Sequence, residues 1–80
     1  MNAKDAVAKR FKMLCRERNL TFNELANLSG VTPSTLYSVM DERRRDISIL
    51  TIKKFCDGLE MSLADFFDNE FFYELEPEIK

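Results

Sequence analysis

Histidine is absent from this 80-residue sequence, and glycine, proline and cysteine each occur only twice. Without histidine the chain lacks the most common general base, the serine-type catalytic triads and the zinc sites that combine cysteine with histidine. Two glycines cannot build a glycine-rich phosphate-binding loop. We therefore expect a protein that is not an enzyme and that holds no metal ion and no cofactor.

Long apolar runs are also missing, because no stretch approaches the roughly 20 residues that a membrane span requires. The first residues carry charge throughout and lack the apolar core of a secretion signal. Cys15 and Cys56 lie far apart and form no C-x-x-C motif. We therefore expect a cytoplasmic protein without membrane contact, in which both thiols are reduced and buried.

The net charge of −2 conceals an uneven distribution. Residues 1–54 contain eleven Lys/Arg and six Asp/Glu, a net charge of +5, whereas residues 55–80 contain one Lys and eight Asp/Glu, a net charge of −7. This division indicates one surface for a polyanion and a second surface that repels it. The alternative is that both sets form ordinary solvated faces.

Apolar spacing predicts a compact all-α domain of five helices without strands. The apolar stripe of the first helix, residues 3–18, consists of Val7, Phe11, Leu14 and Cys15. The rest of its surface is expected to carry Lys4, Lys9, Arg10, Lys12, Arg16 and Arg18. Ser48 and Ser62 are placed to cap the fourth and fifth helices, and Gly58 to end the fourth. The buried face of the fourth helix is expected to consist of Ile49, Ile52, Phe55, Cys56 and Leu59.

Two short helix signals separated by one glycine lie between Leu20 and Met40. Thr21 and the glutamate three residues later form a capping box at the start of the first helix. Thr32 caps the second helix, which opens with a proline at the one position where a missing N–H is harmless. Gly30 between them is predicted to adopt a positive φ. This order is typical of a helix-turn-helix, whose second helix can enter the major groove of DNA.

The motifs that carry a resemblance run Thr21-x-x-Glu24-Leu25-Ala26, Ser29-Gly30-Val31-Thr32 and Ser34-Thr35-Leu36-Tyr37, then continue through Ile49 to Leu59 and Ser62 to Phe67. With them, residues 7–67 resemble the phage-repressor type (Cro-like, or Xre) helix-turn-helix family of bacterial and phage regulators. The resemblance implies a five-helix repressor-like domain in which the third helix is the recognition helix. It also implies double-stranded DNA as the partner.

The candidates for contact with base edges are Ser34, Tyr37 and Ser38, flanked by Thr32 and Thr35. The first three share one helical face. Hydroxyls bond to any base type, so these residues read sequence permissively and make none of the bidentate pairs that arginine or glutamine provide. In the alternative interpretation, the serines and threonines simply begin a helix and Tyr37 covers the edge of the core. For Thr32, capping explains the residue as well as DNA contact does.

The candidates for contact with the DNA backbone lie on either side of the recognition helix. After it come Arg43, Arg44 and Arg45, which can reach phosphates or a narrow minor groove; alternatively, they pair with the neighbouring acidic residues at 41, 42 and 46. Before it, Thr21 and Asn23 stand at a helix start where polar groups can bind a phosphate. Capping alone explains Thr21, which leaves Asn23 freer.

Aromatic residues are concentrated among acidic ones near the end of the sequence. We expect residues 1–69 to form the DNA-binding domain and residues 70–80 an acidic aromatic extension. One or two of the rings can complete the core with Phe66. The rest are expected to form a homodimer interface, with Phe71, Phe72, Tyr73 and Leu75 as its candidates.

These observations predict a sequence-specific DNA-binding regulator, repressor-like and homodimeric, that places two recognition helices in successive major grooves of a two-fold operator. The alternative, from a different class, is a protein-interaction module or antitoxin-like partner that acts through the acidic aromatic end. Salt-dependent binding to random duplex DNA distinguishes the two, because a pure interaction module makes few phosphate contacts.

Overall fold

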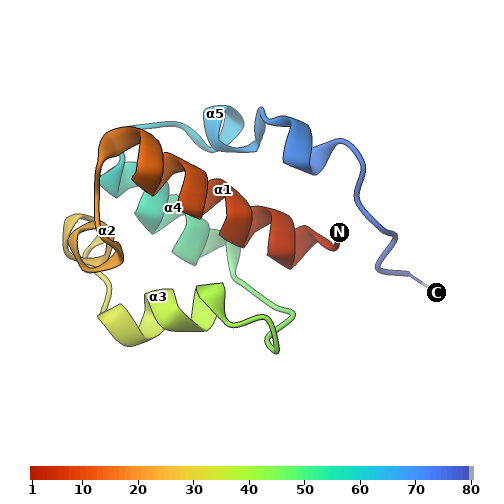
Figure 1. Cartoon of the computed structure of the whole chain (residues 1–80), viewed down its shortest axis with the longest axis horizontal. Helices are drawn as coiled ribbons and strands as arrows, with labels where there is room; N and C mark the ends of the chain where they lie inside the picture. Colours follow the sequence, from red (N-terminus) through yellow and green to blue (C-terminus); the bar gives the residue numbers. More distant parts are fainter. Residues whose placement is uncertain (80) are drawn as a thin grey trace.

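The computed structural model describes residues 1–79, and helices account for most of them. The elements are α1 (Ala3–Arg18), α2 (Phe22–Ser29), α3 (Pro33–Met40), α4 (Ile49–Gly58), α5 (Leu63–Phe67) and the short 3-10 helix η1 (Glu70–Phe72). α1 crosses the middle of the molecule with α4 behind it, α3 on one side, and α5 and η1 on the other (Figure 1). No strand occurs among residues 1–79, so the predicted all-α fold of five α-helices is confirmed. No helix in this part of the chain has the length and apolar character to cross a membrane.

Each α-helix begins at a polar residue whose side chain accepts a hydrogen bond from the backbone amide three positions later. The residues that do so are Asn2, Thr21, Thr32, Ser48 and Ser62. Such caps satisfy amides that have no partner inside the helix. The local sequence therefore determines where these helices begin. For this reason the sequence predicted four of the five caps, and only Asn2 was not predicted.

The two glycines serve different purposes. Gly30 ends α2 with φ +69°, which confirms the predicted left-handed turn between α2 and α3. Gly58 is the last residue of α4, but the left-handed residue that follows this helix is Glu60, with φ +56°. A Cβ atom on Gly58 would lie 3.0 Å from the backbone of Leu28 and 2.5 Å from the hydroxyl of Ser29. Gly58 is therefore needed mainly because α2 and α4 approach closely there.

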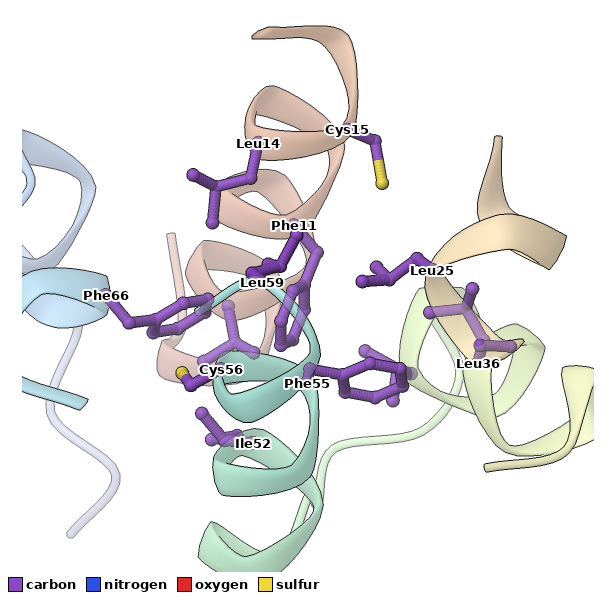
Figure 2. Close-up of a cluster of buried hydrophobic side chains, with 13 residues drawn as sticks. Phe11, Leu14, Cys15, Leu25, Leu36, Ile52, Phe55, Cys56, Leu59 and Phe66 are labelled. Atoms are coloured by element: carbon purple, nitrogen blue, oxygen red, sulfur yellow. The ribbon is translucent and has the colours of Figure 1, made fainter. Parts of the chain in front are cut away.

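Three phenylalanine rings from α1, α4 and α5 meet at the centre of the core (Figure 2). The ring centroid of Phe11 lies 4.9 Å from that of Phe55 and 4.7 Å from that of Phe66. The predicted stripe of α1 is buried as expected. The prediction for Ile49 is wrong, because its side chain is 55% exposed. Ile49 is the first residue of α4, and the contribution of this helix to the core begins one turn later at Ile52.

Both cysteines are free and buried, as predicted. Cys15 lies on α1 and Cys56 on α4. Burial raises the pKa of each thiol above its ordinary value, because the charged thiolate is poorly solvated in an apolar environment. Both side chains therefore act as small apolar groups of the core.

Three cations of α1 donate to the C-terminal ends of three other helices. Lys4 Nζ lies 2.9 Å from the carbonyl oxygen of Asp41, the C-cap of α3. Arg18 donates to the carbonyl of Leu59, the C-cap of α4. The carbonyl oxygens at a helix end have no intrahelical donor and carry partial negative charge, so cations satisfy and stabilise them.

Arg10 makes the corresponding contact with α5. Its Nε lies 2.8 Å from the carbonyl oxygen of Phe66, and one of its terminal nitrogens lies 3.1 Å from that of Asp65. The side chains of Lys4 and Arg10 are buried, with residue exposures of 4% and 9%. The expectation that all six cations of this helix lie on the surface is therefore wrong for these two, because acceptors from distant parts of the chain compensate their burial.

The C-terminal segment folds back along α1. Phe72 is partly buried against the core, with its ring centroid 5.0 Å from that of Phe67. Lys9 Nζ lies 5.1 Å above the centre of the Phe71 ring. Further on, the amide of Glu76 lies 3.0 Å from the carbonyl oxygen of Met1, and its carboxylate lies 3.1 Å from the N-terminal ammonium group. Phe72 is thus the ring from η1 that completes the core beside Phe66.

Replacing Arg10 by Ala should lower the free energy of unfolding by about 2 kcal/mol or more. The substitution leaves two carbonyl oxygens at the end of α5 without their charged donor and leaves the buried space of the side chain unfilled. Lys54→Ala, an exposed cation of α4, is the control and should change stability by no more than about 0.5 kcal/mol. Urea unfolding followed by circular dichroism measures both. Equal stabilities of the two variants would show that Arg10 has no structural role.

Candidate nucleic-acid interface

α3 is fixed from behind by two apolar side chains and turns a polar face outward. Leu36 and Val39 are almost completely buried in the core. Ser34 and Tyr37 are exposed and Ser38 is half-buried, in the spacing that places all three on one side of the helix. Tyr37 is 59% exposed and does not belong to the core cluster, so it does not cover the core edge. The structure therefore brings the three predicted base readers together on one accessible face.

The flanking threonines use their hydroxyl groups inside the helix cap. Thr32 Oγ1 accepts the amide of Thr35 at 3.4 Å, and the two hydroxyl oxygens lie 3.1 Å apart. Thr32 is exposed and Thr35 is half-buried. Capping thus accounts for the hydroxyl of Thr32, while the methyl groups of both residues make no part of the cap.

The three arginines in the loop after α3 differ in whether they form an ion pair. Arg43 forms a bidentate contact with the carboxylate of Asp41, at 3.1 Å from Nε and 3.2 Å from a terminal nitrogen, and its backbone amide lies 3.0 Å from the same carboxylate. These hydrogen bonds lower the pKa of Asp41 and raise the pKa of Arg43. Arg44 and Arg45 are exposed and form no ion pair with any residue in 1–79. Of the three arginines, the alternative of pairing with acidic neighbours therefore applies to Arg43 alone.

Arg44 also lines a small hollow between α3 and the start of α4. Ser38 contributes to its wall from α3, and Ser48 and Thr51 contribute from α4. The hydroxyl oxygens of Ser48 and Thr51 lie 2.8 Å apart. Ser48 follows the arginines closely in the sequence and was predicted only as the cap of the fourth helix. The structure places it in the wall of this hollow as well.

At the start of α2, the predicted capping box is present in both directions. Glu24 donates its amide to the hydroxyl of Thr21 at 3.1 Å, and the amide of Thr21 donates to the Glu24 carboxylate at 3.0 Å. The bond from the Thr21 backbone is the main cause of the lowered pKa of Glu24. Asn23 is exposed and makes no side-chain hydrogen bond within residues 1–79. Asn23 is therefore the freer of the two candidates at this helix end.

The candidates for dimer contact lie away from the polar face of α3. η1 and α3 pack on different sides of α1 (Figure 1). Tyr73 is 76% exposed, whereas Phe71, Phe72 and Leu75 are each half-buried within the chain. The aromatic end and α3 are thus separated by the width of α1.

The chain matches the family of Cro/C1-type HTH DNA-binding domains over residues 10–71. It belongs to this family. The structure is also similar to the crystal structure of the prophage Lp1 protein 11, with a TM-score of 0.82 and 33% sequence identity, over 94% of this chain and 100% of that one. No curated protein matches the sequence. Membership of the Cro/C1-type family identifies the chain as a DNA-binding helix-turn-helix regulator, and the alternative of a pure interaction module is not favoured.

The residues that hold the loop after α3 of this Cro/C1-type domain in place were not predicted from the sequence. Lys4 binds the carbonyl of Asp41, and the carboxylate of Asp41 binds Arg43, so the path of the loop is set from α1. A signal for Lys4 was present, because it stands three residues before Val7 on the apolar stripe of α1. A lysine at such a position is buried only if an acceptor elsewhere in the fold compensates it.

The Asp41–Arg43 contact predicts a specific titration. The pKa of the Asp41 carboxyl group should lie below its ordinary value in the unaltered chain and return toward it in Arg43→Ala. A depressed pKa in the folded state means that the contact stabilises the loop above the ordinary pKa and that this stabilisation is lost as pH falls through the folded value. Carbon-detected NMR of the side-chain carboxyl measures both. An unchanged Asp41 pKa in Arg43→Ala contradicts this contact.

Proposed function

We propose that this Cro/C1-type protein binds operator DNA sequence-specifically, as a repressor-like regulator that inserts α3 into the major groove. One observation carries the proposal: α3 presents Ser34, Tyr37 and Ser38 to solvent while Leu36 and Val39 anchor it in the core. A recognition helix needs this combination of an accessible polar face and a rigid support.

The chemistry of this face supports recognition by many modest contacts. Serine hydroxyls donate to or accept from any base edge, and the methyl groups of Thr32 and Thr35 suit the methyl group of thymine. None of these side chains makes the bidentate pair that discriminates one base by about 1–3 kcal/mol. We infer that phosphate contacts supply much of the affinity and that specificity is distributed over several base pairs.

We assign the phosphate contacts mainly to Arg44 and Arg45, with Asn23 at the start of α2. Both arginines lie in the loop that directly follows the recognition helix, and neither is held by an acidic residue among those described. Arg43 must first leave the carboxylate of Asp41 to reach DNA, which reduces what it gains there. Arg43 instead fixes the conformation of the loop through Asp41.

Salt dependence separates these roles. Arg44→Ala and Arg45→Ala should each flatten the slope of log K against log salt by about 0.9, the value for one lost phosphate contact. Arg43→Ala should flatten it less. Replacing Ser34 and Ser38 together by Ala should narrow the gap in affinity between operator and random duplex while leaving the slope nearly unchanged.

The operator for this measurement comes from selection of bound sites in a random DNA pool. Fluorescence anisotropy at several salt concentrations then gives affinity and slope for each variant. Lys54→Ala, an exposed cation of α4, is the matched control for loss of one positive charge. If the serine variant and the arginine variants lose the same slope and the same specificity, the assignment of roles is wrong.

We further propose that the regulator acts as a homodimer on a two-fold site. Two-fold operators require two recognition helices about 34 Å apart, one turn of DNA. The candidates for the contact remain Phe71, Phe72, Tyr73 and Leu75; Phe72 already packs partly on its own core, and Tyr73 offers the most exposed ring. The acidic surroundings of this segment would repel phosphates, which favours a protein partner there.

A further inference from the structure

A groove runs along the exposed side of α1, between the end of α3 and η1. Its apolar lining comes from Met1, Met13, Met40 and Phe71, and its volume is about 610 Å³. Its charged border consists of three exposed cations of α1, Lys9, Lys12 and Arg16, and of two acidic residues, Asp5 and Glu42. None of the DNA contacts proposed above uses this groove.

The groove combines two kinds of surface that suit one kind of ligand. Methionine side chains are flexible and polarizable, so a Met-lined surface adapts to irregular apolar groups. Neither Lys12 nor Arg16 forms an ion pair with any residue in 1–79, and Lys9 contacts only the face of the Phe71 ring. A phosphate backbone would satisfy the cations but leave the apolar lining unfilled. A peptide that alternates apolar and acidic side chains satisfies both.

The tail of this chain, defined here as residues 73–79, has such a pattern. It alternates Tyr73, Leu75, Pro77 and Ile79 with a glutamate at each position between them. In an extended segment, alternate side chains point to opposite sides, so one side of the tail is apolar and the other carries three carboxylates. Pro77 favours an extended backbone at the residue before it. Tyr73 and Ile79 are 76% and 90% exposed within one copy, and Leu75 is only partly covered.

The tail of the same copy is held at one end of the groove, because Met1 both lines the groove and binds Glu76. Its Glu76 is bonded to the first residue through both its amide and its carboxylate. From there the tail continues away from α1, beyond the N-terminus (Figure 1). To fill its own groove it would have to reverse direction past its own attachment, whereas the tail of another molecule can enter from solvent.

We propose that the groove binds the tail of a second copy, with each copy giving its tail to the other once Glu76 has left Met1 of its own copy. This inference rests on the homodimer of the proposed function and deepens it by naming the two surfaces that meet. The lengths agree, because α1 extends about 17 Å from Asp5 to Arg16 at 1.5 Å per residue, and a seven-residue extended tail spans about 20 Å. The apolar side of the tail covers the methionines, and the long side chains of Lys12 and Arg16 reach past the edge of the tail to the carboxylates on its outer side.

The exchange places the dimer contact next to the DNA-binding surface. Met40, in the lining of the groove, is the last residue of α3. Glu42 lines the same groove and lies in the loop that carries the arginines. A docked tail therefore touches the end of the recognition helix and sets the distance between the recognition helices of the two copies.

Charge reversal on each side of this contact tests the exchange. One variant carries Lys12→Glu and Arg16→Glu in the groove, and the other carries Glu74→Lys and Glu78→Lys in the tail. Each variant alone places like charges opposite each other, so its dimer should dissociate at concentrations at least about tenfold higher than those for the unaltered chain. An equimolar mixture should form a heterodimer, because each groove then meets a tail of opposite charge.

Analytical ultracentrifugation without DNA measures the association, and circular dichroism verifies that each variant is folded. A chain with Lys53→Glu and Lys54→Glu on α4 changes the net charge as much as the groove variant does and should dimerise like the unaltered chain. If either reversed variant dimerises normally, or if the folded mixture remains monomeric, the exchange is refuted while the homodimer stands. If the unaltered chain is monomeric yet binds its operator specifically, the homodimer and the exchange both fail and recognition by α3 stands.

Discussion

Lys4, Arg10 and Arg18 donate from α1 to carbonyl oxygens at the C-terminal ends of α3, α5 and α4. A small core of short helices has many helix ends for its size, and each end leaves carbonyl groups without an intrahelical donor. By satisfying three of these ends, α1 fixes the helices that surround it as well as covering their apolar faces. The orientation of α3 depends on this arrangement, because Lys4 binds the carbonyl of Asp41, where α3 ends and the following loop begins.

The cations of the sequence are thus divided among three tasks. On α1, Lys4, Arg10 and Arg18 bind the C-terminal ends of other helices. Lys9, Lys12 and Arg16 border a groove that we propose binds an acidic segment. We propose that Arg44 and Arg45, which are exposed in the loop after α3, contact phosphates. The net positive charge of residues 1–54 therefore indicates a partner of opposite charge without locating the surface that meets it, since burial removes part of that charge from solvent.

Features determined by neighbouring residues could be predicted from the sequence, and features determined by distant contacts could not. Helix starts at Thr21 and Thr32 and the left-handed turn at Gly30 follow from caps and backbone geometry a few residues long. The exposure of Ser34 and Tyr37 follows from helical spacing once Leu36 is buried. The burial of Arg10 depends on carbonyl groups 55 and 56 residues away, and the need for glycine at position 58 depends on how closely α2 approaches. The pairing of Arg43 with Asp41 was one of several that the loop sequence allows, and the fold determines which one forms.

We propose that the outward face of α3 reads DNA and that the aromatic end serves a protein contact. An NMR titration of the chain with its selected operator duplex tests this most directly, because each backbone amide reports on its own surroundings. We expect the largest shifts at Ser34, Tyr37 and Ser38 on α3 and at Arg44 and Arg45 in the following loop. Residues 73–79 should change little beyond any change that dimer formation alone produces. Shifts concentrated in residues 73–79 and along the groove of α1, with α3 unaffected, would contradict it.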